Sequence, residues 1–185
     1  KNRVIVDFDQ GTMVIEHLDD EKVKEKLKGA VVTALMTPGD PRAVDLFSDK
    51  PIGLEGSPYL QGLIADQNDK PINDWKDAEQ FADYLVSNKL QARKINVNGA
   101  SKNVRSVRIA MVNNNVEKKA MKFSPMVRKY SETTEVSRSL IFAVMKIESG
   151  FNPFAVSSTP AFGLMQLVPV SGGRDAYRKA KGLDE

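Results

Sequence analysis

A single carboxylate at the end of a helix-like segment has the clearest chemical potential in this sequence. Glu148 opens the run Glu148-Ser149-Gly150-Phe151-Asn152-Pro153, which is followed by Gly163-Leu164-Met165-Gln166. A carboxylic acid on a rigid element beside a glycine-containing loop is suited to protonate a leaving oxygen, such as the oxygen of a glycosidic bond. The candidate chemistry is therefore general acid catalysis by Glu148.

The element expected to hold Glu148 is a helix over Ser137–Ser149. Apolar residues recur along one face at the spacing of three and four that a buried helix face requires: Leu140, Ile141, Val144 and Met145. Glu148 continues this stripe, so we expect its side chain to face the apolar interior and its pKa to be raised by burial. A glutamate reaching from a helix end into water is the alternative, and spacing alone leaves it open.

The end of this helix also has a sequence signal. Gly150 suits the left-handed residue that often ends a helix, and Asn152-Pro153 prevents its continuation. A weaker helix is expected from Gly173 to Lys181, where Asp175 would have a capping role.

The C-terminal part of the chain resembles a known catalytic module. The run ESGFNPFAVSSTPAFGLMQLVP is similar to the first half of the soluble lytic transglycosylase module, whose fold is like that of goose-type lysozyme. Two of its motifs, Glu-Ser and Gly-Leu-Met-Gln, are present in order. The resemblance implies that the module continues past Glu185 to a third motif, Ala-Tyr-Asn, so we expect a truncated chain and do not assume that it is active alone.

Upstream segments resemble the N-terminal domain of the membrane-bound lytic murein transglycosylase C family. They are Val4 to Phe8, Asp9 to Thr12, Ala43 to Asp49 and Phe81 to Leu85. The resemblance implies a periplasmic protein whose full-length form is anchored to the outer membrane by a lipidated cysteine.

The resemblance also implies an activity, namely cleavage of the β-1,4 bond between N-acetylmuramic acid and N-acetylglucosamine with formation of a 1,6-anhydro sugar. Glu148 would be the general acid and base. Ser149 would orient the muramic N-acetyl group or Glu148, while Phe162, Met165 and Gln166 would contact the glycan. This reaction needs one carboxylate and no cofactor. A hydrolytic muramidase of the same fold and a non-catalytic peptidoglycan-binding protein are the alternatives.

Composition narrows the classes of function. The 185 residues include 41% hydrophobic and 28% charged residues, with no cysteine and one histidine, which indicates a globular chain without disulfides or thiolate metal sites. His17 is the single histidine and lies in a predicted hairpin, which argues against a serine-type catalytic triad and excludes a histidine-rich metal site. Asp66 to Lys70 lacks the glycine and glutamate of a calcium loop and is expected to be a turn. The charge of +3 suits a polyanionic polymer, and no nucleic-acid-binding pattern is present.

The patterning predicts an α+β class in two domains. Residues 1–114 should form a small positioning or binding domain, with a hairpin over Arg3–Phe8 and Thr12–His17, helices from Asp19-Asp20 to Met36 and from Asp77 to Lys89, and a strand over Val104–Val112 that pairs with the hairpin. A loop should cover Asp49–Asp74, with one short strand near Tyr59–Ala65. Residues 115–185 should be the first part of the helical catalytic module. In it, Ser124-Pro125 is either the N-cap and first residue of a helix that runs to about Tyr130 or Ser131, or a kink inside a longer helix.

Overall fold

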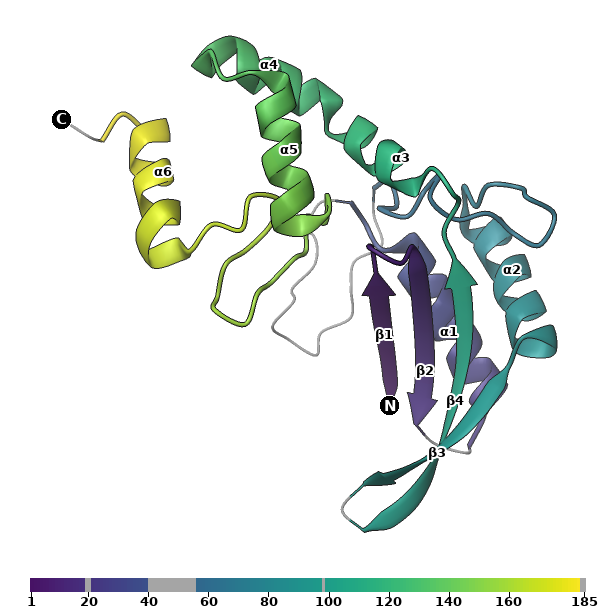
Figure 1. The fold of residues 1–185 in the computed structure, drawn as a ribbon. Coiled ribbons are helices and arrows are strands. Elements are labelled where there is room, and N and C mark those ends of the chain that lie inside the picture. The colour runs from purple at the N-terminus through teal and green to yellow at the C-terminus, as the bar shows by residue number, and fades with distance from the viewer. Residues whose placement is uncertain (19–20, 40–55, 98, 184–185) are drawn as a thin grey trace. The chain divides into compact units, whose positions relative to one another are not determined.

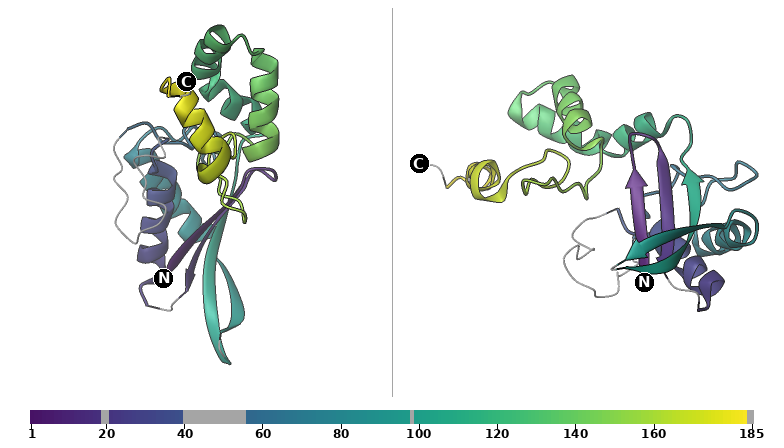
Figure 2. Two further views of the ribbon diagram at one scale, coloured as in Figure 1. Left: turned by 90° about the vertical axis from the view of Figure 1, so that its left-hand side faces the viewer. Right: turned by 60° about the horizontal axis from the view of Figure 1, so that its bottom comes forward.

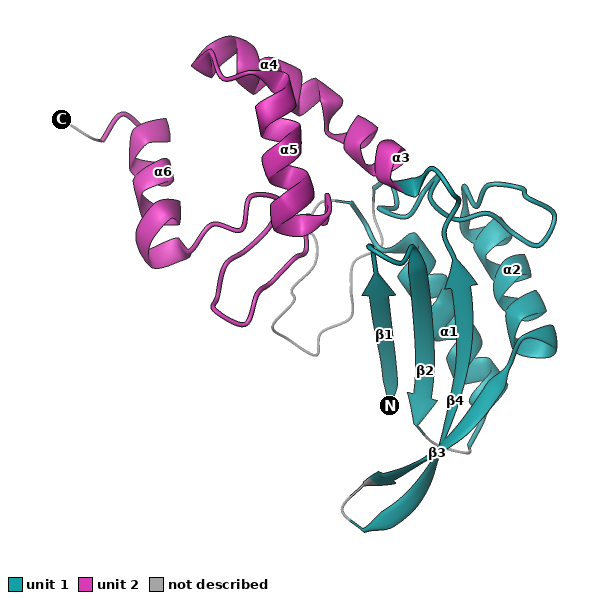
Figure 3. Cartoon of the chain, in the orientation of Figure 1, with its two compact units in different colours: residues 1–115 teal, residues 116–185 magenta. Residues whose placement is uncertain are grey.

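The chain divides into two compact units, Lys1–Asn115 and Val116–Glu185 (Figure 3). A computed structural model describes residues 1–18, 21–39, 56–97 and 99–183. Unit 1 combines an antiparallel sheet with helices, and unit 2 is built from helices and loops. The predicted α+β class is confirmed. The start of the first predicted helix, at Asp19-Asp20, and the segment Ala43–Asp49 lie outside the described residues.

The sheet of unit 1 has the strand order β1-β2-β4-β3. β1 (Asn2–Asp7) and β2 (Thr12–Leu18) form the predicted hairpin, with Val4 opposite Ile15. β4 (Ala100–Ala110) pairs antiparallel with β2, as predicted. β3 (Gln91–Val97) was not predicted, because its sequence QARKINV is mostly polar and offers no apolar face. The dipeptide Asn98-Gly99 is the signal that could have revealed this second hairpin.

Two helices lie against one face of this sheet (Figures 1 and 2). α1 (Val23–Met36) ends where the sequence predicts, and α2 (Trp75–Asn88) begins two residues earlier than expected. The start of α2 is fixed by Asp74, whose carboxylate accepts a hydrogen bond from the Asp77 backbone N–H at 2.9 Å. Alternate residues of β2 and β4 point toward these helices and are buried with them; they include Met13, Ile15, Val107, Ile109, Leu27, Val31, Phe81 and Leu85.

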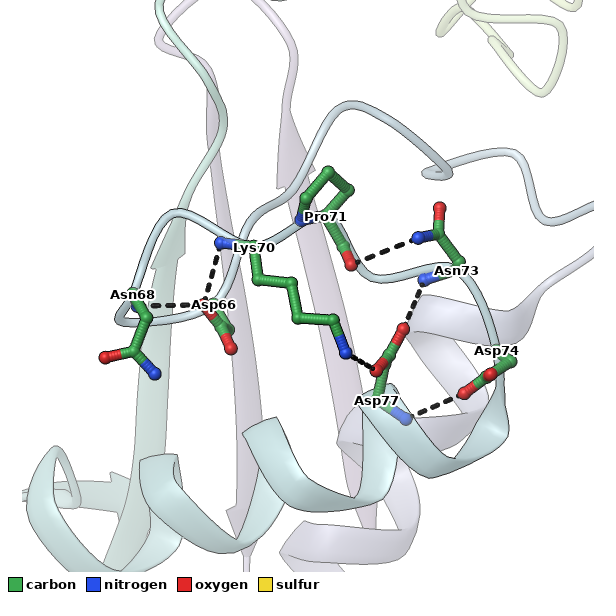
Figure 4. Close-up of polar contacts among 7 residues, drawn as sticks. All are labelled: Asp66, Asn68, Lys70, Pro71, Asn73, Asp74 and Asp77. Atoms are coloured by element: carbon green, nitrogen blue, oxygen red, sulfur yellow. Dashed lines mark hydrogen bonds and ion pairs between the residues drawn. The ribbon is translucent and has the colours of Figure 1, made fainter.

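The segment before α2 is a loop held by internal hydrogen bonds (Figure 4). One carboxylate oxygen of Asp66 accepts hydrogen bonds from the backbone N–H groups of Asn68 and Lys70, which confirms the predicted turn. The short strand predicted near Tyr59–Ala65 is wrong. Its apolar side chains are buried, but its backbone forms turns in which Leu63 N donates to Leu60 O at 2.9 Å.

The first helices of unit 2 are α3 (Asn115–Lys122), which starts at the last residue of unit 1 and was missed by the sequence analysis, and α4 (Ser124–Thr134). The predicted helices over Ser137–Ser149 and near Gly173–Lys181 are present as α5 (Arg138–Ser149) and α6 (Arg174–Ala180), and a π-turn over Pro169–Gly173 precedes α6. A small apolar cluster packs α4 against α5; its buried members are Val127, Met145 and Phe151.

Candidate active site

Helix α5 carries the candidate acid on its last turn and has well-defined caps at both ends. The Ser137 hydroxyl accepts a hydrogen bond from Leu140 N at 3.2 Å at the N-terminus. Gly150 has φ 56° and ψ 30°, and its N–H donates to the Lys146 carbonyl at 3.1 Å, which confirms the predicted left-handed end. Glu148 is therefore held on a helix turn whose end is fixed.

Phe151 folds the chain back under the end of α5. It also has a positive φ of 65°, its N–H donates to the Met145 carbonyl, and its ring is only 3% exposed. The ring meets Phe142 edge to face, with centroids 6.3 Å apart. Burial of this ring offsets the unfavourable backbone conformation and makes Phe151 the anchor of the helix end.

Glu148 is exposed, so the prediction that its side chain faces the apolar interior is wrong in this structure. The buried side of α5 centres on Met145, whereas Ile141 and Val144 are half-buried and Leu140 is exposed. Phe151 fills the apolar space below Met145, and no described residue covers the last turn on the side of Glu148. Periodicity placed Glu148 on the same stripe as Met145 but could not show whether another element covers that part of the stripe.

Ser149 connects the end of α5 to the Gly-Leu-Met-Gln segment. Its hydroxyl lies 2.9 Å from the Leu164 carbonyl oxygen and 3.0 Å from the Met145 carbonyl oxygen. The single hydroxyl proton can be shared between these two acceptors. The structure thus assigns Ser149 a contact that sequence reasoning could not find, because the acceptor on the loop is a backbone group that no side-chain motif reveals.

The Gly-Leu-Met-Gln segment is a tight hairpin turn. Phe162 and Leu167 exchange backbone hydrogen bonds at 3.0 and 3.1 Å, and Gln166 N donates to Gly163 O at 3.2 Å. Gly163 has φ 72°, a conformation that favours glycine. Inside the turn, Gln166 Nε2 donates to the carbonyls of Gly163 and Ala155 at 2.9 and 3.1 Å. The side-chain N–H groups of Gln166 are therefore engaged in hydrogen bonds that hold the loop.

These contacts place the candidate residues around one helix end. Ser149, the residue after Glu148, bonds to the turn that carries Met165, which is 37% exposed. Phe162 is half-buried at the base of the hairpin. Asp175 does not cap α6, contrary to the prediction, because the helix begins at Arg174 and places Asp175 inside its first turn, 3.6 Å from the Arg174 guanidinium.

Other candidate chemistries find no support in the described ranges. No group of three or more His, Asp or Glu side chains in these residues is placed to hold a metal ion. His17 is buried in unit 1, where its Nδ1 lies 2.6 Å from the Asn2 side-chain oxygen. None of the helices over the described residues is both long and apolar enough to span a bilayer. The helix-end carboxylate remains the site with the clearest chemical potential.

Comparison with known proteins defines the class of the helical unit. Residues 125–185 match the Transglycosylase SLT domain, and residues 1–122 match the N-terminal domain of Membrane-bound lytic murein transglycosylase C. The two matches together span nearly the whole chain.

The chain belongs to the membrane-bound lytic murein transglycosylase C family. It is 40% identical over 184 residues to the Membrane-bound lytic murein transglycosylase C of Photorhabdus laumondii and 39% identical to that of Yersinia enterocolitica. The corresponding Yersinia pestis protein is 40% identical over the same length. Each match covers 98% of this chain and 50% of the relative, so the chain spans half the length of these curated relatives.

Proposed function

We propose that this chain is part of a peptidoglycan lytic transglycosylase in which Glu148 is the general acid and base. The observation that carries the proposal is the position of Glu148 on a capped helix end, with Ser149 joining it to the Gly-Leu-Met-Gln turn, in a segment that matches the Transglycosylase SLT domain. The names of the relatives describe lytic murein transglycosylases that are membrane-bound.

The proposed reaction uses one carboxylate in two steps. The Glu148 carboxylic acid donates its proton to the oxygen between N-acetylmuramic acid and N-acetylglucosamine as that bond breaks. The resulting carboxylate then removes the proton of the muramic C6 hydroxyl, whose oxygen attacks the anomeric carbon of the same sugar. This attack is intramolecular and gains from proximity, so the product is a 1,6-anhydro sugar without a water nucleophile.

Exclusion of water from Glu148 must come from outside the described residues of unit 2. Leu140 is 55% exposed and Ile147 is 81% exposed on the same helix, an unusual amount of apolar surface for one short element. We propose that the glycan and a further part of a longer protein cover this helix end, as suits relatives that are twice as long. Covering would strengthen every electrostatic interaction at the carboxyl group.

The other site residues have supporting roles in this proposal. Ser149 is a positioning residue that fixes the turn beside the acid, since its hydroxyl is engaged with backbone carbonyls. Met165 offers exposed apolar surface for a sugar ring, and Gln166 retains its side-chain carbonyl as an acceptor for a substrate N–H. Phe162 lies half-buried at the base of the hairpin and would contact the glycan from there.

The division of labour follows the two family matches. We propose that residues 1–114 form a domain that positions or binds the cell wall and that residues 115–185 are the first part of the catalytic module. The partner is the peptidoglycan glycan strand. The protein would act in the periplasm, held to the outer membrane by a segment outside this chain.

The test compares Glu148→Gln with Glu117→Gln, an exposed control in the same unit. A protein extended to the length of its relatives is incubated with purified sacculi, and soluble products are identified by mass spectrometry. We expect anhydromuropeptides from the parent and the control, and a loss of at least about 100-fold with Glu148→Gln. Reducing sugars in place of anhydro products would indicate a muramidase, and full activity of Glu148→Gln would refute the assigned role.

A further inference from the structure

A groove in unit 1 is lined by none of the proposed site residues. It has a volume of about 600 Å³, in the range of ligand-binding pockets. Its floor is apolar and comes from Phe81 and Leu85 of α2, Ile109 of β4 and Met111 just after β4, which are all buried. Tyr84 adds a half-buried ring that stacks on Phe81 with centroids 6.4 Å apart.

One wall of the groove is an open stretch of strand edge. β3 stops pairing with β4 at Ser106, whereas β2 continues to pair with β4 as far as Ala110. Val112 N, on the β3 side, donates to Leu63 O. Since backbone groups alternate sides along a strand, Arg108 and Ala110 present their N–H and C=O groups to this same side. Within the described ranges, no strand pairs with them there, and such an edge invites an extended peptide.

The rim of the groove carries both signs of charge. Lys89 and Arg108 are exposed cations, and neither forms an ion pair with another described residue. Asp66 and Asp69 supply carboxylates from the loop before α2. Asp66 is held in place because its Oδ1 accepts two backbone hydrogen bonds, from Asn68 and Lys70, while its Oδ2 stays available to a ligand (Figure 4). A ligand that carries both a carboxylate and an amine would match this rim.

We propose that this groove binds the peptide stem of peptidoglycan. The inference rests on the proposed function, because that function supplies a substrate in which peptides hang from the glycan. A stem peptide offers amide groups for the open edge, carboxylates for Lys89 and Arg108, and the amine of a diamino acid for Asp66 or Asp69. The open stretch from Val107 to Ala110 spans about 10 Å, enough for a short extended peptide.

The unusual backbone of a stem peptide fits a short edge better than a long one. Its residues alternate in chirality and one of them is linked through a side-chain carboxyl, so its amides cannot follow a regular ladder over many residues. Two backbone contacts, at Arg108 and Ala110, together with charges at the rim, would give binding without such a ladder. Unit 1 would then hold the wall by its peptides while unit 2 acts on its sugars.

The test titrates the whole isotope-labelled chain with the free tetrapeptide L-alanyl-γ-D-glutamyl-meso-diaminopimelyl-D-alanine and follows amide shifts by NMR. We expect shifts at Lys89, Arg108 and Ala110. The double variant Lys89→Glu with Arg108→Glu should weaken binding by roughly five- to tenfold. The matched control is Lys94→Glu with Lys102→Glu, which makes the same charge change at exposed positions outside the groove and should bind within about twofold of the parent.

Each outcome decides the proposal. Absence of shifts at about 10 mM peptide, shifts confined to other residues, or equal weakening in the control would overturn it. The free peptide has no glycosidic bond, so its binding is independent of cleavage and should persist in Glu148→Gln. Peptide binding without cleavage of sacculi would refute the proposed function alone, whereas cleavage without peptide binding would refute the groove alone.

Discussion

The two units differ in how well their described residues bury their own apolar side chains. Unit 1 exposes few large hydrophobic residues, chiefly Val4, Ile5 and Trp75, and encloses a continuous core between its sheet and helices. Among residues 116–183, the buried hydrophobic core consists of Val127, Met145, Phe151 and Ala161, while Leu140, Ile147, Val170 and Tyr177 are each more than half exposed. Unit 1 has the interior of an independent domain, and unit 2 has the surfaces of a part that needs a partner.

This contrast bears on function, because the candidate acid lies in the less complete unit. A carboxylic acid that donates a proton to a sugar oxygen works best when water is excluded. The helix end of α5 supplies the position of Glu148 and its link to the turn, but the described residues do not supply the cover. The groove for which we propose peptide binding lies in unit 1, so the proposed binding and the proposed cleavage would depend on different units.

The prediction with the largest expected effect compares the truncation of one apolar side chain in each unit. Leu27 is fully buried in α1, so Leu27→Ala should lower the free energy of unfolding of unit 1 by about 2–5 kcal/mol. Ile147 is 81% exposed in α5, so Ile147→Ala should change stability by less than about 0.5 kcal/mol. Hydrogen exchange of amides in each unit measures both effects. A large loss with Ile147→Ala would mean that unit 2 already buries this face.

A second prediction concerns the ion cluster on the sheet of unit 1. Glu16 accepts hydrogen bonds from Arg93 at 2.8 Å and from Arg3 at 2.5 Å, and these guanidinium groups hold the pKa of its carboxyl below the usual range. Glu16→Gln should cost about 1–3 kcal/mol at pH 7, because two arginines lose their charged acceptor. The exposed change Glu79→Gln is the control and should be nearly neutral.

The same cluster sets the sign of a pH dependence. Since the pKa of Glu16 is lower in the folded state, its contribution is complete above the ordinary glutamate value near 4.3 and is lost as the pH falls through the folded value. The stability difference between the parent and Glu16→Gln should therefore shrink in acid, below roughly pH 4. Denaturant titrations that follow β-strand amides would measure it, and a difference that grew in acid would contradict the assigned cause.

A third prediction isolates the link between α5 and the Gly-Leu-Met-Gln turn. Ser149→Ala removes the hydroxyl that bonds Leu164 O and should cost about 1 kcal/mol, with faster hydrogen exchange in residues 162–167. Ser139→Ala on the exposed side of the same helix is the matched control and should leave exchange in the turn unchanged. In a protein that cleaves sacculi, Ser149→Ala should lower kcat more than it changes KM, because a loosened turn misplaces the groups around Glu148. Unchanged exchange in the turn would contradict this positioning role.

Sequence reasoning succeeded where a local signal was strong. The hairpin β1–β2, the helix α5 and its left-handed end at Gly150 follow from alternation, helical spacing and glycine conformation. It failed where the decisive partner is distant in the sequence. β3 is held by pairing with β4 and not by its own polar sequence, and the turns at Tyr59–Ala65 bury apolar side chains without strand pairing.

In the candidate site too, local sequence signals located residues but could not show their contacts with distant parts of the chain. The residue types and their order located Glu148 and the turn, and the family resemblance gave them a chemistry. Neither could show that Ser149 is committed to Leu164 O or that Gln166 bonds within its own loop, because these acceptors are backbone carbonyls. Exposure of Glu148 was also out of reach, since burial depends on elements that cover a helix and not on the periodicity of the helix itself.

The smallest predicted effect concerns the loop that forms one wall of the peptide groove. Lys70 Nζ lies 2.5 Å from a carboxylate oxygen of Asp77, and this hydrogen bond raises the pKa of Lys70 and lowers that of Asp77 (Figure 4). The contribution of Asp77 is lost as the pH falls through its lowered value, and that of Lys70 is lost as the pH rises through its raised value. Stabilisation by the pair should therefore form a plateau between acid and alkaline limits.

Lys70→Met keeps the aliphatic stem and removes the charge, so it tests this plateau directly. We expect a change in stability smaller than that of Glu16→Gln, because the Lys70 side chain is 60% exposed and water screens the pair. The change should fade in about 1 M salt, where the screening length is only about 3 Å. Parallel NMR titration with the tetrapeptide should show little loss of affinity, since the backbone hydrogen bonds to Asp66 remain. A loss of peptide affinity as large as that of the Lys89 and Arg108 double variant would mean that the Lys70–Asp77 salt bridge, and not the hydrogen-bonded turn at Asp66, shapes this wall of the groove.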